Sequence, residues 1–349
     1  NYNSLTLEKY DFKRIILTGD WHFGCHANSK AWLYSNRDYF KKCFIPWLRE
    51  NVREGDLLLH LGDLYENRQS IEQHVNDIAV DIVEEISDIL PFWIILGNHD
   101  AYKKTTNQIN ALKNIKFLEN VRVFDKPEVV NINSHKCLMM PWISDKNRNY
   151  SEKEVIKDNG GDYLFTHTDF KGAKYNRSVT LEDGIEIDEN FHFKKVYSGH
   201  IHIRQKLYND QLTFVGTPYH ITRSDKKNEK GFYILDTETE EDTFIRNDFS
   251  PKYMDVHLKN YYDKELDYLL EIIDGNFVDI YLESRLSEQM NVFDLIDYLD
   301  EYARDLEPFF YEDSKNYESV NQQIEGEYDF GKKLDILNLI QERVSDMDW

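Results

Sequence analysis

Apolar residues in the first third of the chain form short continuous runs, and each run ends beside a glycine and a polar residue. The runs at 13–19, 56–61 and 93–96 have the length and apolar character of strands that are buried on both faces. Between them, residues 32–48 and 71–86 repeat apolar side chains every three or four positions, the spacing of an amphipathic helix. This order of strands and helices predicts a parallel sheet with right-handed crossovers.

Beyond residue 102 the apolar runs become shorter, and turn residues such as Gly160-Gly161 and Gly216-Thr217-Pro218 separate them. We expect these strands to form a mixed sheet that stacks on the first one. The expected strands cover residues 121–124, 128–132, 136–140, 163–166, 194–198, 212–215 and 232–236. Residues 1–250 are therefore predicted to form one α/β domain.

The pattern changes near Pro251. Residues 251–305 alternate strand-like and helical segments in the order of a small α+β domain. Residues 306–349 begin with an acidic, polar stretch that reads as a tether. A short amphipathic helix follows, with Leu337, Ile340, Val344 and Met347 on one face. Such a helix is marginal by itself, so we expect this face to bind a partner or to dock on its own domain.

Composition limits the classes of protein that the chain can represent. With 349 residues and 41% hydrophobic residues, it can form a substantial core. Three cysteines, none in a CxxC pair, favour a reducing cytoplasm. No apolar run approaches the roughly 18–20 residues of a membrane-spanning helix. The net charge of −22 argues against general binding of nucleic acid by the whole surface.

Polar side chains that bind metals follow the predicted strand ends. In chain order they are Asp20, His22, Asp63, Asn98, His167, His200 and His202. Imidazole, carboxylate and amide groups suit Mn²⁺, Fe²⁺ or Zn²⁺. Seven such groups are too many for one ion with an open position, but they suit two ions that share a carboxylate. Several of these residues also have a structural alternative. Either aspartate could be a turn residue, Asn98 could favour a left-handed turn, and His167 could be a core histidine. The alternation of His200 and His202 on a strand could arise by chance.

The ordered pattern Asp-x-His, Gly-Asp, Gly-Asn-His-Asp, His and Gly-His-x-His resembles the calcineurin-like metallophosphoesterase superfamily. The resemblance implies a four-layer β-sandwich flanked by helices and a site for two metal ions. It assigns Asp20, His22, Asp63 and His202 to one ion. It assigns Asp63, Asn98, His167 and His200 to the other, so that Asp63 bridges them. It also implies that His99 protonates the leaving oxygen and that Asp100 orients His99.

Further segments at 20–24, 123–127, 140–142, 216–218 and 231–236 are similar to the SbcD-type DNA-repair nucleases, and in particular to the recombination endonuclease subunits of tailed phages. This resemblance implies a Mn²⁺-dependent exonuclease and endonuclease with a DNA-contacting capping domain at 251–305. It implies a homodimer formed by the helices at 32–48 and 71–86. It also implies that the C-terminal helix binds an SMC-like ABC ATPase.

One segment departs from that pattern. Many cellular members carry a histidine shortly after Gly-Asp, whereas this chain continues Leu64-Tyr65-Glu66-Asn67-Arg68. The balance of exonuclease and endonuclease activity therefore stays open.

Loops between the metal motifs contain basic residues that could bind phosphate, unless they are merely solvated. They are Lys103, Lys104, Lys171, Lys174, Arg177, Arg223, Lys226 and Lys227. Two other functions remain open alongside a DNA nuclease. The first is a small-molecule phosphodiesterase or phosphatase of the same superfamily, and the second is a non-catalytic scaffold that keeps the fold.

Overall fold

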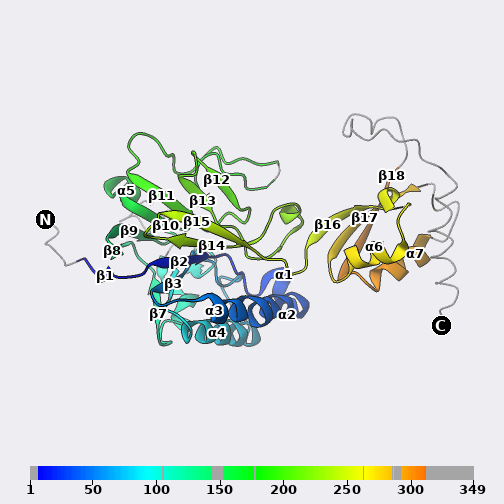
Figure 1. Ribbon diagram of the computed structural model, residues 1–349, viewed down its shortest axis with the longest axis horizontal. Helices are drawn as coiled ribbons and strands as arrows, with labels where there is room; N and C mark the ends of the chain where they lie inside the picture. The colour runs from blue at the N-terminus through cyan, green and yellow to red at the C-terminus, as the bar shows by residue number, and fades with distance from the viewer. Residues whose placement is uncertain are drawn as a thin grey trace. The chain divides into compact units, whose positions relative to one another are not determined.

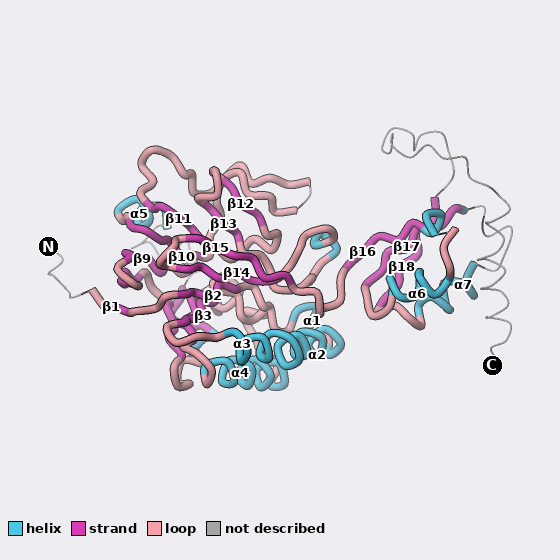
Figure 2. Tube along the Cα trace, in the orientation of Figure 1, coloured by secondary structure: helices cyan, strands magenta, loops and turns pink. Residues whose placement is uncertain are grey.

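The computed structural model describes residues 7–103, 106–143, 152–176, 178–261, 263–284, 286 and 292–311. The chain divides into two compact units, Asn1–Ser250 and Pro251–Trp349. Figure 1 shows the elements of both units, and Figure 2 separates their helices, strands and loops by colour.

The first unit contains the two predicted sheets. The six-stranded sheet has the order β15-β14-β2-β3-β4-β7. Its strands are β2 (Arg14–Thr18), β3 (Asp56–His60), β4 (Phe92–Ile95), β7 (Val121–Phe124), β14 (Gly231–Asp236) and β15 (Glu241–Arg246). Strands β2, β3 and β4 are parallel, as predicted. The assignment of residues 121–124 and 232–236 to the second sheet is wrong, because β7 pairs with β4 in the parallel direction and β14 pairs with β2 in the antiparallel direction. Strand β15 pairs with the other edge of β14.

The second sheet of this unit has the order β1-β8-β9-β10-β11-β13-β12. Its strands are β1 (Lys9–Tyr10), β8 (Glu128–Ile132), β9 (His135–Met140), β10 (Gly161–Thr166), β11 (Phe193–Ser198), β12 (Gln205–Leu207) and β13 (Leu212–Phe214). It is mixed, because β8 with β9 and β12 with β13 are antiparallel while β9, β10, β11 and β13 are parallel. A separate hairpin consists of β5 (Ala101–Lys103) and β6 (Thr106–Asn110).

The two sheets stack through alternating inward-facing residues, among them Leu17 and Leu59 from one sheet and Phe165 and Tyr197 from the other. Helices α2 (Lys30–Tyr39), α3 (Ile45–Asn51) and α4 (Gln73–Ser87) cover the outer face of the six-stranded sheet (Figure 1). A π-helical turn at Phe40–Phe44 joins α2 to α3. Helix α5 (Glu152–Asp158) packs on the outer face of the seven-stranded sheet. This arrangement confirms the predicted four-layer sandwich.

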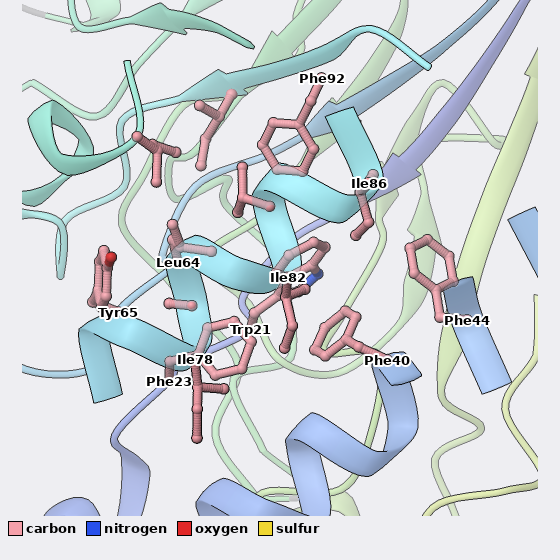
Figure 3. Packing of buried hydrophobic residues seen from close by; sticks show 14 of the residues in the cluster. Trp21, Phe23, Phe40, Phe44, Leu64, Tyr65, Ile78, Ile82, Ile86 and Phe92 are labelled. Atoms are coloured by element: carbon pink, nitrogen blue, oxygen red, sulfur yellow. The ribbon is translucent and has the colours of Figure 1, made fainter. Parts of the chain in front are cut away.

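Two aromatic residues on either side of His22 anchor the segment that follows β2. Trp21 and Phe23 are 0% and 1% exposed, and both lie in the core between the sheet and the helices, near Phe40 and Ile82 (Figure 3). The indole N–H of Trp21 donates to Thr18 Oγ1 at 2.9 Å. Removing such a buried aromatic side chain typically costs about 3–5 kcal/mol, so these anchors hold the backbone at His22 firmly.

A left-handed turn follows these anchors. In the short helix α1 (Cys25–Asn28), the φ angles of His26, Ala27 and Asn28 are 53°, 55° and 61°. Consecutive residues with side chains rarely adopt this conformation, because Cβ then approaches the following carbonyl oxygen.

The second unit contains β16 (Tyr253–His257), α6 (Leu266–Ile273), β17 (Phe277–Glu283), α7 (Val292–Asp300) and β18 (Asp305–Tyr311). Its three strands form a parallel sheet whose buried side packs against both helices. The predicted start of the tether at residue 306 is wrong, because β18 pairs with β17 as far as Tyr311. Pro308 concealed this strand, and proline is tolerated there because β18 lies at the edge of the sheet.

The predicted partner-binding residues Leu337, Ile340, Val344 and Met347 lie outside the described residues.

Short 3₁₀ turns occur at Ala111–Asn114, Arg223–Asp225 and Leu258–Tyr261. Among the helices that the structure describes, none has the length and apolar character needed to cross a bilayer.

Candidate metal centre

The seven predicted ligands meet at one edge of the two sheets. Asp20 and His22 follow β2, Asp63 follows β3, and Asn98 follows β4. From the other sheet, His167 follows β10, while His200 and His202 follow β11. The carboxyl ends of parallel strands therefore bring the residues together, as expected for an α/β site.

One group of side chains consists of Asp20, His22 and His202, whose possible ligand atoms all lie within 4.8 Å of one another. His22 Nε2 is 2.9 Å from His202 Nε2 and 3.9 Å from Asp20 Oδ1. Two imidazole nitrogens at 2.9 Å repel each other unless a proton or a cation lies between them. This pair therefore fits a shared metal ion.

A second group consists of Asp63, His167 and His200. Asn98 Oδ1 joins it at 2.9 Å from His167 Nε2 and 2.8 Å from His200 Nδ1. Asp63 Oδ2 lies 3.2 Å from His167 Nε2 and 3.7 Å from His22 Nε2. The carboxylate of Asp63 thus faces both groups, which is the position that a bridging ligand requires.

The electrostatics of this edge also favour cations. Asp20 and Asp63 are 0% and 1% exposed. Burial opposes ionisation of Asp63, but His167 and His22 hold the pKa of its carboxyl well below the usual range. Burial likewise opposes the charged form of both histidines. Nearby carboxylates nevertheless raise the pKa of His22 to about 9 and that of His167 to about 10. Buried carboxylates beside imidazole groups form a donor set that suits divalent ions.

The local backbone is strained to bring these side chains together. The φ angles of Asp20, His22, Asp63 and His200 are 52°, 48°, 58° and 77°, all in the left-handed region. Non-glycine residues adopt this region infrequently, and such strain is concentrated at functional sites.

Two glycines of the sequence motifs allow this close approach. A Cβ atom at Gly97 would lie 2.2 Å from the backbone nitrogen of Asp63, and one at Gly199 would lie 2.4 Å from the carbonyl oxygen of Leu61. The strand ends could not meet if either position carried a side chain.

Several residues outside the two groups orient the histidines. His167 Nδ1 lies 2.6 Å from the carbonyl oxygen of Leu61, so Nδ1 carries the proton and Nε2 faces the centre. Asp169 Oδ1 lies 3.2 Å from His200 Nε2. Glu66 Oε2 lies 2.7 Å from His22 Nδ1, although the ring N–H does not point along this contact. Asp169 and Glu66 could not be predicted from the sequence, because a single acidic residue in a loop has no distinctive pattern.

A buried ion pair supports the backbone of the last ligand. Lys230 Nζ donates to the carbonyl oxygen of His202 at 2.7 Å and to Asp225 Oδ1 at 2.6 Å. Asp225 Oδ2 also accepts the backbone N–H groups of Ile221 and Thr222, both at 2.8 Å.

Asp100 does not contact the ring of His99, contrary to the expectation from the family resemblance. Its carboxylate accepts backbone N–H groups from Asp63, Leu64, Tyr65 and Gly97 at 2.9–3.2 Å. The His99 ring is held instead by the carbonyl oxygen of Glu66, 2.6 Å from Nδ1. Asp100 therefore braces the loops that carry Asp63 and Asn98.

The predicted phosphate-contacting residues differ in their exposure. Lys103, Lys171, Lys174, Arg223 and Lys227 are exposed. Lys171 lies 3.4 Å from Glu186. Lys226 is only 8% exposed, so the prediction of a surface contact there is wrong. Lys104 and Arg177 lie outside the described residues.

Comparison with known proteins agrees with this geometry. The profile of the calcineurin-like phosphoesterase family matches residues 13–204. The chain is 29% identical over 237 residues to exonuclease subunit 1 of Enterobacteria phage T4. The matched region covers 67% of this chain and 68% of the phage protein. The chain is also 29% identical over 122 residues to the DNA double-strand break repair protein Mre11 of Halobacterium salinarum, covering 34% of this chain and 29% of that protein.

The family match includes all seven predicted ligands, His99 and the strands that carry them. The chain therefore belongs to the calcineurin-like phosphoesterase family and is a metal-dependent phosphodiesterase.

Proposed function

We propose that the chain is a DNA nuclease that hydrolyses phosphodiester bonds with two divalent ions, most naturally Mn²⁺. It would act as a 3′-5′ exonuclease and single-strand endonuclease in the processing of DNA ends. The observation that carries this proposal is the double cluster of His, Asp and Asn groups centred on Asp63. The name of the phage relative, an exonuclease subunit, and that of the archaeal relative, a DNA repair protein, support DNA as the substrate.

In this proposal Asp20, His22, Asp63 and His202 hold one ion, and Asp63, Asn98, His167 and His200 hold the other. Two ions there would polarise the phosphate and supply a nucleophilic water at neutral pH. Imidazole and carboxylate donors are compatible with Mn²⁺.

His99 is the proposed proton donor. The contact of its Nδ1 with the carbonyl oxygen of Glu66 assigns a proton to that nitrogen. Nε2 is then the atom that can give a second proton to the leaving oxygen when the ring is charged. The backbone N–H of His99 donates to Asp63 Oδ1 at 2.7 Å. This hydrogen bond ties the proton donor to the proposed bridging carboxylate.

We also propose that the chain works in an assembly. The word "subunit" in the name of the phage relative supports a partner, which we infer to be an SMC-like ABC ATPase bound by the C-terminal segment. A homodimer through the α2–α4 region and DNA contacts by the second unit belong to the same proposal. Cys25, Cys43 and Cys137 are free thiols, which supports a reducing compartment such as the host cytoplasm.

The test measures cleavage of linear and single-stranded circular DNA with Mn²⁺, beside hydrolysis of bis-p-nitrophenyl phosphate. We expect His99→Ala and Asp63→Ala to lower DNA cleavage by at least about 10²-fold. His192→Ala, an exposed histidine outside the centre, serves as the matched control. Diester hydrolysis with intact DNA, even after the ATPase is added, would favour a small-molecule phosphodiesterase. Inactivity on both substrates despite bound Mn²⁺ would favour a scaffold.

A further inference from the structure

A half-buried arginine lies beside the metal centre, in the segment where the chain departs from the cellular nucleases. The Cζ atom of Arg68 is 5.5 Å from the centroid of the Trp142 ring, and its Nη2 is 2.8 Å from the side-chain amide of Asn98. Within the part of the chain that the structure describes, Nη1 is buried and has no hydrogen-bond partner. The guanidinium therefore has a donor that a bound ligand could satisfy.

The amide of Asn98 can satisfy either the arginine or the metal centre. When Oδ1 faces His167 and His200, Nδ2 faces Arg68 Nη2, and two donors then oppose each other. When the amide is reversed, Oδ1 accepts from Arg68 at 2.8 Å, and the amide nitrogen faces the two histidines and Asp63. A metal ion needs the oxygen and so selects the first orientation. Metal binding therefore deprives Arg68 of this acceptor.

An anion is the natural replacement for that acceptor. An unpaired donor in a buried position is unfavourable, and a guanidinium presents a planar fork that matches phosphate oxygens. Burial lowers the pKa of Arg68, and the charges of Asp63 and Asp100 oppose part of this effect. The loaded centre thus presents an unsatisfied cation beside the amide that binds one of its ions.

Trp142 lies beside the guanidinium of Arg68. Its ring lies within cation–π distance of the guanidinium. Its backbone is held at both polar groups, because its N–H donates to the carbonyl oxygen of Leu96 at 2.8 Å and its carbonyl oxygen accepts from Asn107 Nδ2 at 2.7 Å. This contact gives a role to the Met140-Pro141-Trp142 motif.

We propose that Arg68 is a catalytic residue that binds a non-bridging oxygen of the scissile phosphate, and that Trp142 positions it. The inference rests on the proposed phosphodiester hydrolysis and adds a specific contact to it. In that reaction the oxygen of water bonds to phosphorus, the bond from phosphorus to the leaving oxygen breaks, and that oxygen takes a proton from His99. The water gives up one proton to the solvent, and His99 takes one back from the solvent. The non-bridging oxygens carry the charge throughout, and Arg68 stabilises it in the transition state.

The experiment compares Arg68→Met, Arg68→Lys and Arg122→Met. Arg122 is the matched control, because it also lies over an aromatic ring, 4.5 Å from the centroid of Phe124, but pairs with Glu128 on the surface at 2.8 Å. We expect Arg68→Met to lower kcat/KM for bis-p-nitrophenyl phosphate by about 10²-fold. Arg68→Lys keeps the charge without the fork and should fall between Arg68→Met and wild type. Arg122→Met should keep the wild-type rate.

Binding measurements separate this role from a structural one. Calorimetry with inorganic phosphate in the presence of Mn²⁺ should show about tenfold weaker phosphate binding by Arg68→Met, the loss of one charge-assisted pair. Titration with Mn²⁺ alone should give wild-type affinity. Trp142→Leu should weaken phosphate binding less than Arg68→Met does, with Mn²⁺ affinity unchanged.

Unchanged kcat/KM and phosphate affinity in Arg68→Met would overturn the inference. Lost Mn²⁺ affinity would do so too, because Arg68 would then merely support Asn98. The small diester and inorganic phosphate keep this test independent of DNA. If the wild-type chain hydrolyses the diester but not DNA, the proposed nuclease function fails while the role of Arg68 is still decided. If the wild-type chain hydrolyses neither substrate, the phosphate affinity of Arg68→Met in the presence of Mn²⁺ alone decides whether Arg68 binds phosphate.

Discussion

Replacing Gly97 by alanine is the sharpest test of how the strand ends form the metal centre. The new Cβ would lie 2.2 Å from both the backbone nitrogen and Oδ1 of Asp63. Ordinary van der Waals contact begins near 3.4 Å, so the two strand ends must separate by about 1.2 Å. The hydrogen bonds by which Asp100 connects Gly97 and Asp63 would break as well.

The expected loss follows from the tolerance of a metal site. Ligand distances must hold within about 0.2 Å, and a displacement of about 1 Å in an active site lowers the rate by about 10²-fold. We therefore expect Gly97→Ala to weaken Mn²⁺ binding by at least about tenfold and diester hydrolysis by at least about 10²-fold. The overpacked loop should also lose about 1–3 kcal/mol in free energy of unfolding.

Calorimetric titration with Mn²⁺, hydrolysis of bis-p-nitrophenyl phosphate and urea unfolding measure these three effects. Gly172→Ala is the control, because its φ of 86° strains alanine whereas its Cβ would meet nothing within 4 Å. The control should lose stability without losing Mn²⁺ affinity. Wild-type Mn²⁺ affinity and turnover in Gly97→Ala would refute the steric reasoning.

Three further predictions concern parts of the first unit around the centre. Asp169→Asn removes the charge that faces His200 Nε2, so Mn²⁺ affinity should fall about tenfold in a calorimetric titration; an unchanged affinity would contradict this orienting role. Burial opposes ionisation of Asp225, but Lys230 lowers the pKa of this carboxyl below its usual value. The ion pair with Lys230 therefore stabilises the folded protein above the unfolded pKa of about 3.9, and this contribution disappears as pH falls through the folded pKa. Urea unfolding should therefore show that Asp225→Asn is less stable than wild type at pH 7, with the difference shrinking below about pH 4; a difference independent of pH would contradict it. Ala27→Gly should raise the free energy of unfolding by about 0.5–1 kcal/mol, because a left-handed alanine costs about 1–2 kcal/mol and glycine regains part of that as chain entropy; a less stable variant would show that the turn is not strained.

The grouping of the proposed metal ligands could be predicted from the sequence because each follows a strand end with its own local pattern. Asp63 and Asn98 each follow a glycine at the end of an apolar run, and the topology then makes them neighbours. Asp169 and Arg68 lack such a pattern, since their roles depend on which loop folds against them. Asp100 shows the same limit. Its neighbour in sequence is His99, yet its carboxylate binds the backbone of Asp63 and the two residues that follow it.

Two strands could not be predicted from the sequence for a related reason. Strand β18 was missed because Pro308 and its acidic neighbours lack the apolar character of a central strand. Strand β15 (Glu241–Arg246) was missed because none of its residues is buried, and it forms only through pairing with β14. The burial of Lys226 likewise depends on tertiary packing, which a local count of charges does not include.

The antiparallel pairing of β14 with β2 has a consequence for how the chain folds during synthesis. It joins Tyr233 to Leu17, residues that are 216 positions apart, in the middle of the six-stranded sheet. Until β14 leaves the ribosome, β2 has one unpaired edge, which is a site for aggregation. Contacts of such long range also slow folding, because the intervening chain must be ordered first. All seven proposed metal ligands, of which His202 is the last in sequence, are thus synthesised before β14 can complete the six-stranded sheet.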